Sequence, residues 1–535
     1  MKLTHPAVVA FGIAMLLMLP LVDPLVEPAH QLIYHFDGPL SIVFYPVLIS
    51  IALLCILLTG LLTLARKPGR ARLFFWTALM FLLPWVLLKA SGLLLPWKVS
   101  HHLSLLVFLA GLTTTATLLV CWKPSFQRVF DHAQEFTATV LAFCALSGLL
   151  ILGHVCWSGW QARSTNAAMP LHHYAAAQPT SHSRVIWLIL DELSYRQLYE
   201  HRFPALDLPA FDRLAGQATV FTQVAPAGLM TEYVVPSLIS ALPADAMRAS
   251  ADGRQLYLHD PVQHRWQTFD PHQSVFQDAL DRGYSTSVSG WYNPYCRLMS
   301  QVLDHCFWTN HSPTQSGMSK DQTLLGNTFA PFRTYGSAIL HFIYWRKRQI
   351  SPDQTDAETH IHDYSELLTA SDSMLNDSSA DLLFLHMPIP HPVGIYNRHT
   401  HQLTTGPSTY IDNLALADTY LAHIRSQLEQ RGQWDSSTIL VMGDHSWRTA
   451  PIWSSGTAWT SEEQNASDGA RFDDRPAYIL KLPHQQQPAH IDTPYPAIRT
   501  RALLDAIMDQ RIQSPQELED WVANPSSVAA DSAAQ

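Results

Sequence analysis

The chain has 535 residues, of which 47% are hydrophobic and 15% are charged, and its formal net charge is −10. Many apolar and few charged residues indicate that part of the chain is not in water. Residues 1–160 hold nine Lys or Arg and five Asp or Glu, a net of +4, so the remaining residues carry −14. We therefore expect no nucleic acid as a partner, because nucleic-acid binding needs a basic surface.

The N-terminal part of the chain contains five apolar runs of about the length that spans a bilayer. They lie near residues 6–22, 40–64, 73–95, 103–122 and 136–157. The loop after the second run is basic, and positively charged loops stay cytoplasmic; it holds Arg66, Lys67, Arg70 and Arg72. We predict a five-helix transmembrane anchor over residues 1–158 with its N-terminus inside, so that everything after Trp157 lies outside.

Residues 159–183 are small, polar and Pro-containing, which is typical of a linker. Strand-like and helix-like patterns then alternate. The expected strands are 185–190, 219–224, 284–289, 381–385, 437–442 and 477–481, and the expected helices are 209–218, 273–282 and 409–431. This alternation predicts an α/β fold with a mostly parallel central sheet and helices on both faces. We assign residues 184–513 to this domain and residues 514–535 to a partly disordered tail.

Two of the six cysteines, Cys296 and Cys306, lie in the outer domain. An oxidising compartment outside the membrane favours a disulfide between them over free thiols. Their spacing and the small number of cysteines argue against a structural zinc site.

The stretch from Gly228 to Ser240 combines a turn with the start of a helical pattern, shortly after the expected strand 219–224. A hydroxyl at such a turn lies at a helix N-terminus, where free backbone N–H groups favour anionic oxygen. Thr231 is therefore the candidate nucleophile. The alternative is that Thr231 only caps the helix.

Acidic and imidazole side chains follow three of the expected strands. Asp191-Glu192 comes after the first, His386 and then His391 come after 381–385, and Asp444-His445 comes after 437–442. The carboxyl ends of parallel strands gather ligands at one edge of a sheet. Any one of these groups alone would be weak evidence, since a strand-terminal Asp is commonly a helix cap. Their repetition predicts a metal centre.

Carboxylate oxygens and imidazole nitrogens without thiolate suit zinc or manganese, with calcium or magnesium as alternatives if the histidines contribute little. A bound divalent ion would lower the pKa of the Thr231 hydroxyl, so that an alkoxide could attack phosphorus or sulfur. The same ion would stabilise the negative oxygen that develops in the transition state.

These residues resemble a known family. The set Asp191-Glu192, Thr231 five residues before Pro236, His386 with His391, and Asp444-His445 is similar to the sulfatase branch of the alkaline phosphatase superfamily. The five-helix anchor resembles the membrane-bound members, the phosphoethanolamine transferases and lipoteichoic acid synthases. The resemblance implies an alkaline-phosphatase-like α/β catalytic domain in a bacterial inner membrane protein.

The resemblance also implies roles for single residues. Glu192, Thr231, Asp444 and His445 match the metal ligands, with Thr231 as the covalently modified residue. Asp191 matches the first of the paired acidic residues of soluble sulfatases, and His386 and His391 match the substrate-side histidines.

The sequence departs from the family at several positions. The arylsulfatase signature, Cys or Ser followed two residues later by Pro and then by Arg, is absent after Thr231. Asp444-His445 continues with Ser446-Trp447-Arg448 where family members often have Gly. Arg448 could clamp a phosphate, or it could pair with a surface acid. Arg297, in an aromatic stretch over residues 290–297, could line the substrate pocket or support core packing.

The sequence thus predicts a metal-dependent transferase that moves a headgroup from a membrane phospholipid donor to a glycan or lipid acceptor on the periplasmic side. The first alternative is a sulfatase-like phosphodiesterase or sulfuric ester hydrolase. The second is a non-catalytic, lipid-binding regulator on the same fold. A regulator has no need for Thr231, Glu192, Asp444 and His445 to converge, so the structure of the site discriminates between these readings.

Overall fold

The computed structural model describes residues 5–67, 69–91, 110–111, 114, 117, 124–165, 170–172, 182–311, 323–333, 352–449 and 460–524. The chain divides into two compact units. The hydrophobic unit consists of Met1–Leu32, Gly38–Ser164 and Gln315–Lys347, and the α/β unit consists of Ile33–Asp37, Thr165–Thr314 and Arg348–Gln535. The short segment 33–37, which precedes the second apolar run, therefore belongs to the α/β unit.

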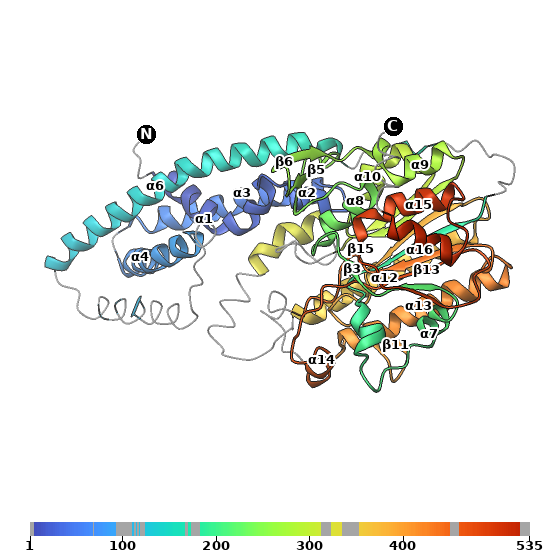
Figure 1. Ribbon diagram of the computed structural model, residues 1–535. Coiled ribbons are helices and arrows are strands. Elements are labelled where there is room, and N and C mark those ends of the chain that lie inside the picture. The colour runs from blue at the N-terminus through green and yellow to red at the C-terminus, as the bar shows by residue number, and fades with distance from the viewer. Residues whose placement is uncertain are drawn as a thin grey trace. The chain divides into compact units, whose positions relative to one another are not determined.

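The hydrophobic unit is helical (Figure 1). Its main helices are α1 (Pro6–Val26), α3 (Ser41–Leu64), α4 (Arg70–Ser91) and α6 (Pro124–Gln161), and α1 packs against the other three. Large apolar side chains on α3 and α6 point outward, among them Ile56 at 72% and Leu150 at 76% exposure. Such a surface is suited to contact with lipid rather than with water.

Three helical spans in the described part of the chain are long and apolar enough to cross a membrane: Pro6–Val26, Ser41–Leu64 and Gln127–Ser164. They correspond to the first, second and fifth expected runs. Helix α4 overlaps the third run, and the fourth run, 103–122, lies almost entirely outside the described residues. The total of five spans therefore stays a prediction.

The α/β unit is built around an eight-stranded sheet with the strand order β14-β2-β13-β12-β1-β9-β7-β8. The five strands from β12 to β8 run parallel to one another, as do β14 and β2, whereas β13 is antiparallel to both of its neighbours. The strands are β1 (Val185–Leu190), β2 (Thr219–Phe221), β7 (Thr286–Trp291), β8 (His305–Thr309), β9 (Leu382–Met387), β12 (Thr438–Met442), β13 (Tyr478–Lys481) and β14 (Ala489–Ile491).

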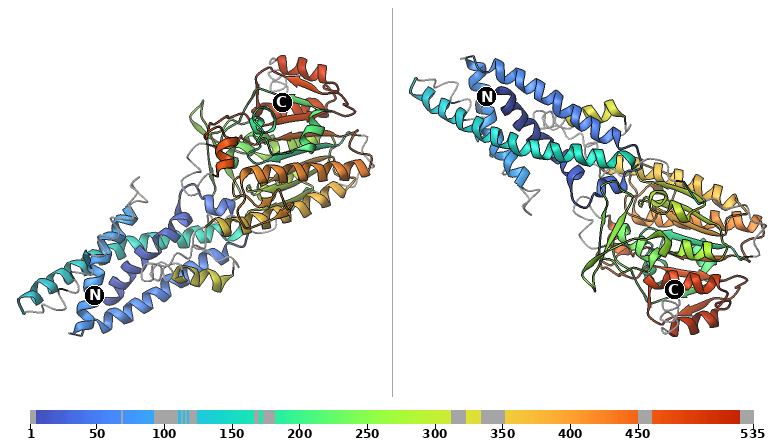
Figure 2. Two further views of the ribbon diagram at one scale, coloured as in Figure 1. Left: turned by 90° about the horizontal axis from the view of Figure 1, so that it is seen from below. Right: turned by 90° about the horizontal axis from the view of Figure 1, so that it is seen from above.

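Helices cover both faces of the sheet because its central strands are apolar on both sides. In β1, Trp187 and Ile189 belong to one core, whereas Ile186, Leu188 and Leu190 belong to the other. Figure 2 shows the two helix layers, with α15 and α16 in red and α13 in orange. The first layer holds α8 (Thr231–Ser240), α9 (Val275–Asp281), α15 (Thr500–Met508) and α16 (Pro515–Ala523), and the second holds α7 (Pro209–Ala215), α12 (Pro352–Asn376) and α13 (Tyr410–Gln430).

All six expected strands are present, with ends shifted by one or two residues and with 219–224 divided into β2 and β3 (Val224–Ala225). The mostly parallel sheet is confirmed. Several smaller elements were not predicted. One is a three-stranded antiparallel sheet of β4 (Ala246–Ala249), β5 (Leu256–Asp260) and β6 (Arg265–Thr268), and two are strand pairs, β10 (Tyr396–Asn397) with β11 (Gln402–Leu403) and β3 with β15 (Tyr495–Pro496). The others are the short helices α2 (Gln31–His35), α10 (Tyr295–Leu298) and α14 (Ser461–Ala466).

The first part of the expected tail is ordered. Ser514 caps α16 in a capping box with Glu517, and Leu518 and Val522 are buried in the core of the α/β unit. The remaining tail, 525–535, lies outside the described residues.

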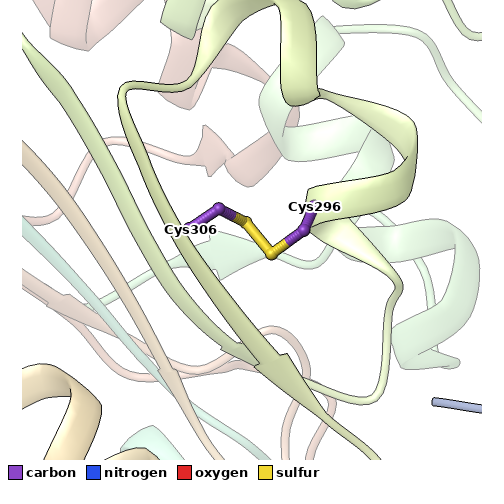
Figure 3. Close-up of a disulfide and its surroundings, with 2 residues drawn as sticks. All are labelled: Cys296 and Cys306. Carbon is purple, nitrogen blue, oxygen red and sulfur yellow. A yellow bond between two sulfur atoms is a disulfide. The ribbon is translucent and has the colours of Figure 1, made fainter. Parts of the chain in front are cut away.

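The expected disulfide is present. Cys296 on α10 and Cys306 on β8 are joined, with their Cα atoms 5.5 Å apart (Figure 3). It ties the loop after β7 to the outermost parallel strand of the sheet.

Candidate metal centre and nucleophile

The acidic and imidazole residues predicted from the sequence meet at one edge of the sheet. Strand β1 lies between β12 and β9, and its register pairs Ile189 with Met442 on one side and with His386 on the other. Asp191-Glu192 after β1 and Asp444-His445 after β12 therefore leave the sheet next to His386. The parallel order of the strands, rather than any local motif, brings the three groups together.

The backbone at this edge is unusually tight. A Cβ atom on Gly443 would lie 2.5 Å from the carbonyl oxygen of Leu193, so only glycine lets the chain after β12 approach the chain after β1. Glu192 has a φ of 64°, a left-handed conformation that is uncommon outside glycine. Such backbone strain persists where the surrounding structure enforces it, and it clusters at functional sites.

Thr231 is the first residue of α8, and Met230 occupies the N-cap position. The alternative that Thr231 only caps the helix is therefore wrong. Its hydroxyl donates to Asp444 Oδ2 at 2.8 Å and lies 3.3 Å from Asp191 Oδ2 and 3.4 Å from His445 Nε2. The side chain of the candidate nucleophile thus points into the cluster.

The donor set of this cluster fits a divalent cation. Asp191, Glu192 and His445 each offer a ligand atom within 4.8 Å of the others, and all three residues are buried. Asp191 Oδ1 and His386 Nε2 are buried and make no hydrogen bond within the described residues. Burial and the charges of Asp444 and Glu192 raise the pKa of Asp191 well above its usual value. A cation would relieve this repulsion and give the Asp191 Oδ1 atom a partner.

Arg448 contacts Glu192. Its Nε donates to Glu192 Oε1 at 2.8 Å, its backbone N–H donates to Glu192 Oε2 at 3.0 Å, and Nη2 makes a further bond to Oε1. Nη1 donates to the carbonyl of Leu229 at 3.0 Å, in the turn before the nucleophile. From the sequence, Arg448 could either clamp a phosphate or pair with a surface acid. In the structure it pairs with a buried acid, Glu192.

The two predicted substrate-side histidines face the cluster from β9 and the loop after it. His386 Nε2 lies 3.9 Å from Asp191 Oδ2, and its Nδ1 is 2.7 Å from the hydroxyl of Tyr295. His391 Nε2 lies 3.8 Å from Glu192 Oε1, and its side chain is 18% exposed. Burial lowers the pKa of His386 to about 4 and that of His391 well below its usual value, so both imidazoles are neutral at pH 7.

The sequence left open whether Arg297 lines the substrate pocket or supports the packing of the core, and the structure shows it bonded to backbone carbonyls. Its guanidinium donates to the backbone carbonyls of Ile33, Tyr34 and Phe36 at 2.8–3.2 Å, at the C-terminal end of α2, where the last carbonyls of a helix have no partner within the helix. Arg297 therefore anchors segment 33–37 within the α/β unit.

Sequence reasoning missed two residues that support the nucleophile. Asn293 donates from Nδ2 to the backbone carbonyl of Thr231 at 3.2 Å, and its Oδ1 accepts from the hydroxyl of Tyr34 at 3.1 Å. Both residues are fully buried. Asn293 is a polar residue within the aromatic stretch 290–297, and that position was a signal from which it could have been found. No local pattern connects Tyr34 to Thr231, because about two hundred residues separate them.

The geometry of the site can now be set beside known proteins. The family model described as Sulfatase matches residues 183–495, more than half of the chain. No curated protein matches the sequence. A phosphonate monoester hydrolase of Agrobacterium radiobacter is 12% identical with a TM-score of 0.38, and the match covers 61% of this chain and 74% of that chain.

Two further solved structures are similar. The PsFucS1 sulfatase from Pseudoalteromonas sp. is 10% identical with a TM-score of 0.39, over 61% of this chain and 67% of that chain. An alkaline phosphatase superfamily protein from Vibrio parahaemolyticus is 13% identical with a TM-score of 0.33, over 66% and 74%. The match to the family model covers the strands of the large sheet, the nucleophile helix and the acidic cluster, and the chain therefore belongs to the sulfatase family.

Proposed function

We propose that this protein is a membrane-anchored, metal-dependent transferase that takes a phospho-substituent from a phospholipid headgroup onto Thr231 and passes it to a glycan or lipid acceptor. The observation that carries the proposal is the position of the Thr231 hydroxyl. It lies at the N-terminus of α8 and donates to Asp444 at 2.8 Å, within a buried cluster of carboxylates and imidazoles.

Asp191, Glu192, Asp444 and His445 are the residues that would hold a divalent cation. Zinc or manganese suits this set, with calcium or magnesium as alternatives. Such a cation supplies a lowered pKa for the nucleophilic hydroxyl and positive charge for the oxygens of the transferred group. The positive end of the α8 dipole supports the same negative charge.

The reaction has two halves. The Thr231 oxygen attacks phosphorus, its proton passes to Asp444, the bond from phosphorus to the lipid oxygen breaks, and that oxygen takes a proton from water and leaves as the alcohol. The acceptor hydroxyl then attacks the phosphothreonine and loses its proton to water, the bond from phosphorus to the Thr231 oxygen breaks, and that oxygen regains the proton held by Asp444. We propose that the neutral imidazoles of His386 and His391, which lie 3.9 Å from Asp191 and 3.8 Å from Glu192, contact the oxygens of the substrate. With water as acceptor, the same intermediate gives a phosphodiesterase.

Three features support a lipid donor and a location on the outer face of the bacterial inner membrane. The three apolar spans, with outward-facing side chains such as Ile56 and Leu150, are suited to a lipid environment. The disulfide between Cys296 and Cys306 is typical of an oxidising compartment such as the periplasm. The basic loop after the second span agrees with this orientation.

The test is the intact mass of the full chain, purified in detergent and incubated with phospholipid and zinc. We expect an adduct with the mass of the headgroup phosphate, absent from Thr231→Ala and present in the control Thr222→Ala, whose hydroxyl bonds to Asp492 outside the cluster. Adding a glycan acceptor should discharge the adduct. Discharge by water alone, at the same rate, would identify a hydrolase, whereas an adduct that persists in Thr231→Ala would refute the proposal.

A further inference from the structure

A second group of metal-ligating side chains lies in the α/β unit away from the catalytic cluster. His311 follows β8, and His362 and Glu366 lie one turn apart on α12. Each offers one ligand atom, and these atoms all lie within 4.8 Å of one another. Asp37, from segment 33–37, adds a carboxylate oxygen 3.6 Å from His311 Nε2. We propose that these four residues form a second, structural site for a divalent transition metal, with zinc as the best-suited ion.

The distances fit a shared ion. Two ligands on a tetrahedral zinc ion at about 2.1 Å are about 3.4 Å apart. His362 Nδ1 and Glu366 Oε1 are 3.5 Å apart, and His311 Nε2 and Asp37 Oδ2 are 3.6 Å apart. Each pair therefore already has the separation that a common ion requires, and the ligand atoms of His311, His362 and Glu366 all lie within 4.8 Å of one another.

The surrounding hydrogen bonds orient these groups as the outer shell of a metal site does. Asp363 Oδ1 lies 2.7 Å from His311 Nδ1, which leaves Nε2 on the side of Asp37. Thr309 donates to Glu366 Oε2 at 2.8 Å and leaves Oε1 on the side of His362. A carboxylate on the far nitrogen of a ligating histidine fixes its tautomer and ring orientation.

The charge of the group favours a cation. Three carboxylates, on Asp37, Asp363 and Glu366, surround two imidazoles, and the Asp363 carboxylate is nearly fully buried. Two histidines and two carboxylates without thiolate form a donor set that suits zinc. A partly buried ion pair between His311 and Asp363 is the simpler alternative, and it requires no bound ion.

The proposed site connects to the wall of the catalytic cluster. Asp363 Oδ2 accepts from Trp291 Nε1 at 2.9 Å. The ring of Trp291 stacks on His360 and meets His391 edge-on at 5.4 Å. An ion at His311 would therefore hold Asp363, Trp291 and segment 33–37 in place, which is a positioning role rather than a catalytic one.

The test is a count of zinc ions per chain, by elemental analysis of the full chain in detergent after equilibration with zinc and removal of free metal. The double variant His362→Ala/Glu366→Gln should hold one ion fewer than the wild type, whatever the occupancy of the catalytic cluster. His362 is 57% exposed, so its replacement removes a ligand without opening the core. The matched control is His305→Ala. In the wild type His305 pairs with Asp377 at 3.6 Å, away from the proposed site, so this variant should hold as many zinc ions as the wild type.

A second measurement separates this site from the catalytic one. The variant Asp191→Asn/Asp444→Asn should still bind zinc at the second site, and added zinc should raise its Tm, whereas zinc should not raise the Tm of a variant that carries all four replacements. An unchanged zinc count in His362→Ala/Glu366→Gln would overturn the proposal and leave His311 as the ion-pair partner of Asp363. Formation of the Thr231 adduct tests the proposed function separately.

Discussion

Replacing Arg448 with Ala should destabilise the α/β unit strongly, because it leaves Glu192 as a buried charge without its guanidinium. The Glu192 side chain is fully buried, and Arg448 contacts both of its carboxylate oxygens. Removing one partner of a buried ion pair costs roughly 3–5 kcal/mol. We expect Tm to fall by roughly 5–10 °C for Arg448→Ala in the presence of a chelator.

The double variant Arg448→Ala/Glu192→Gln checks the cause. Without the Glu192 charge, the loss of the guanidinium leaves no buried ion uncompensated, so the double variant should be more stable than Arg448→Ala alone by at least about 1 kcal/mol. The control is Arg213→Ala, which removes a surface pair with Glu429 and should cost less than about 1 kcal/mol.

A bound cation at Glu192 would replace part of the lost positive charge. Thermal unfolding of the full chain should therefore show a larger zinc-induced rise in Tm for Arg448→Ala than for the wild type. The reasoning is refuted if Arg448→Ala unfolds in chelator within about 1 °C of the wild type, or if the effects of Arg448→Ala and Glu192→Gln simply add.

Three further results are expected. Asn293→Ala removes the donor to the nucleophile's carbonyl and should slow adduct formation about tenfold or more, with the zinc count unchanged, as measured by timed intact-mass spectra. Burial and the charge of Asp278 raise the pKa of the Asp505 carboxyl to about 7 in the folded protein. In the unfolded chain the carboxyl ionises near its ordinary pKa of about 4. The free energy of unfolding therefore falls as pH rises from about 4 to about 7. Asp505→Asn should therefore raise the free energy of unfolding at pH 8 by an amount on the order of 2 kcal/mol and leave it unchanged near pH 3, in thermal or denaturant unfolding. Cys296→Ser should lower the free energy of unfolding by about 2–3 kcal/mol, and a reducing agent should not lower the stability of this variant further.

The sheet and the site edge could be predicted from the sequence because the signals are local. Continuous apolar runs such as 185–190 and 437–442 are typical of strands buried on both faces, and the structure has β1 and β12 there. The polar residues that follow them then meet because neighbouring parallel strands end at one edge. Asp191 and Asp444 are thus brought next to each other by the pairing of β1 with β12.

The rest depended on long-range contacts that no local pattern encodes. The antiparallel direction of β13 is set by its partners β12 and β2, and its apolar run reads the same in either direction. The sequence left open whether Arg297 lines the substrate pocket or supports the core, because a guanidinium is as well suited to phosphate as to backbone carbonyls. Only the fold shows that segment 33–37 supplies those carbonyls.

The charge balance at the nucleophile argues for a cation independently of any family. Asp191, Glu192 and Asp444 are three carboxylates at 0% exposure, and within the described residues Arg448 is the guanidinium that pairs with them. Each unpaired buried charge costs several kcal/mol, so without a bound cation the cluster considerably lowers the stability of the folded protein. In a protein that only bound lipid, an apolar residue of similar size in place of Asp191 would remove that cost. A divalent ion at this position would cancel the two excess charges and would activate the hydroxyl that donates to Asp444, so the proposed catalysis at Thr231 accounts for the costly arrangement.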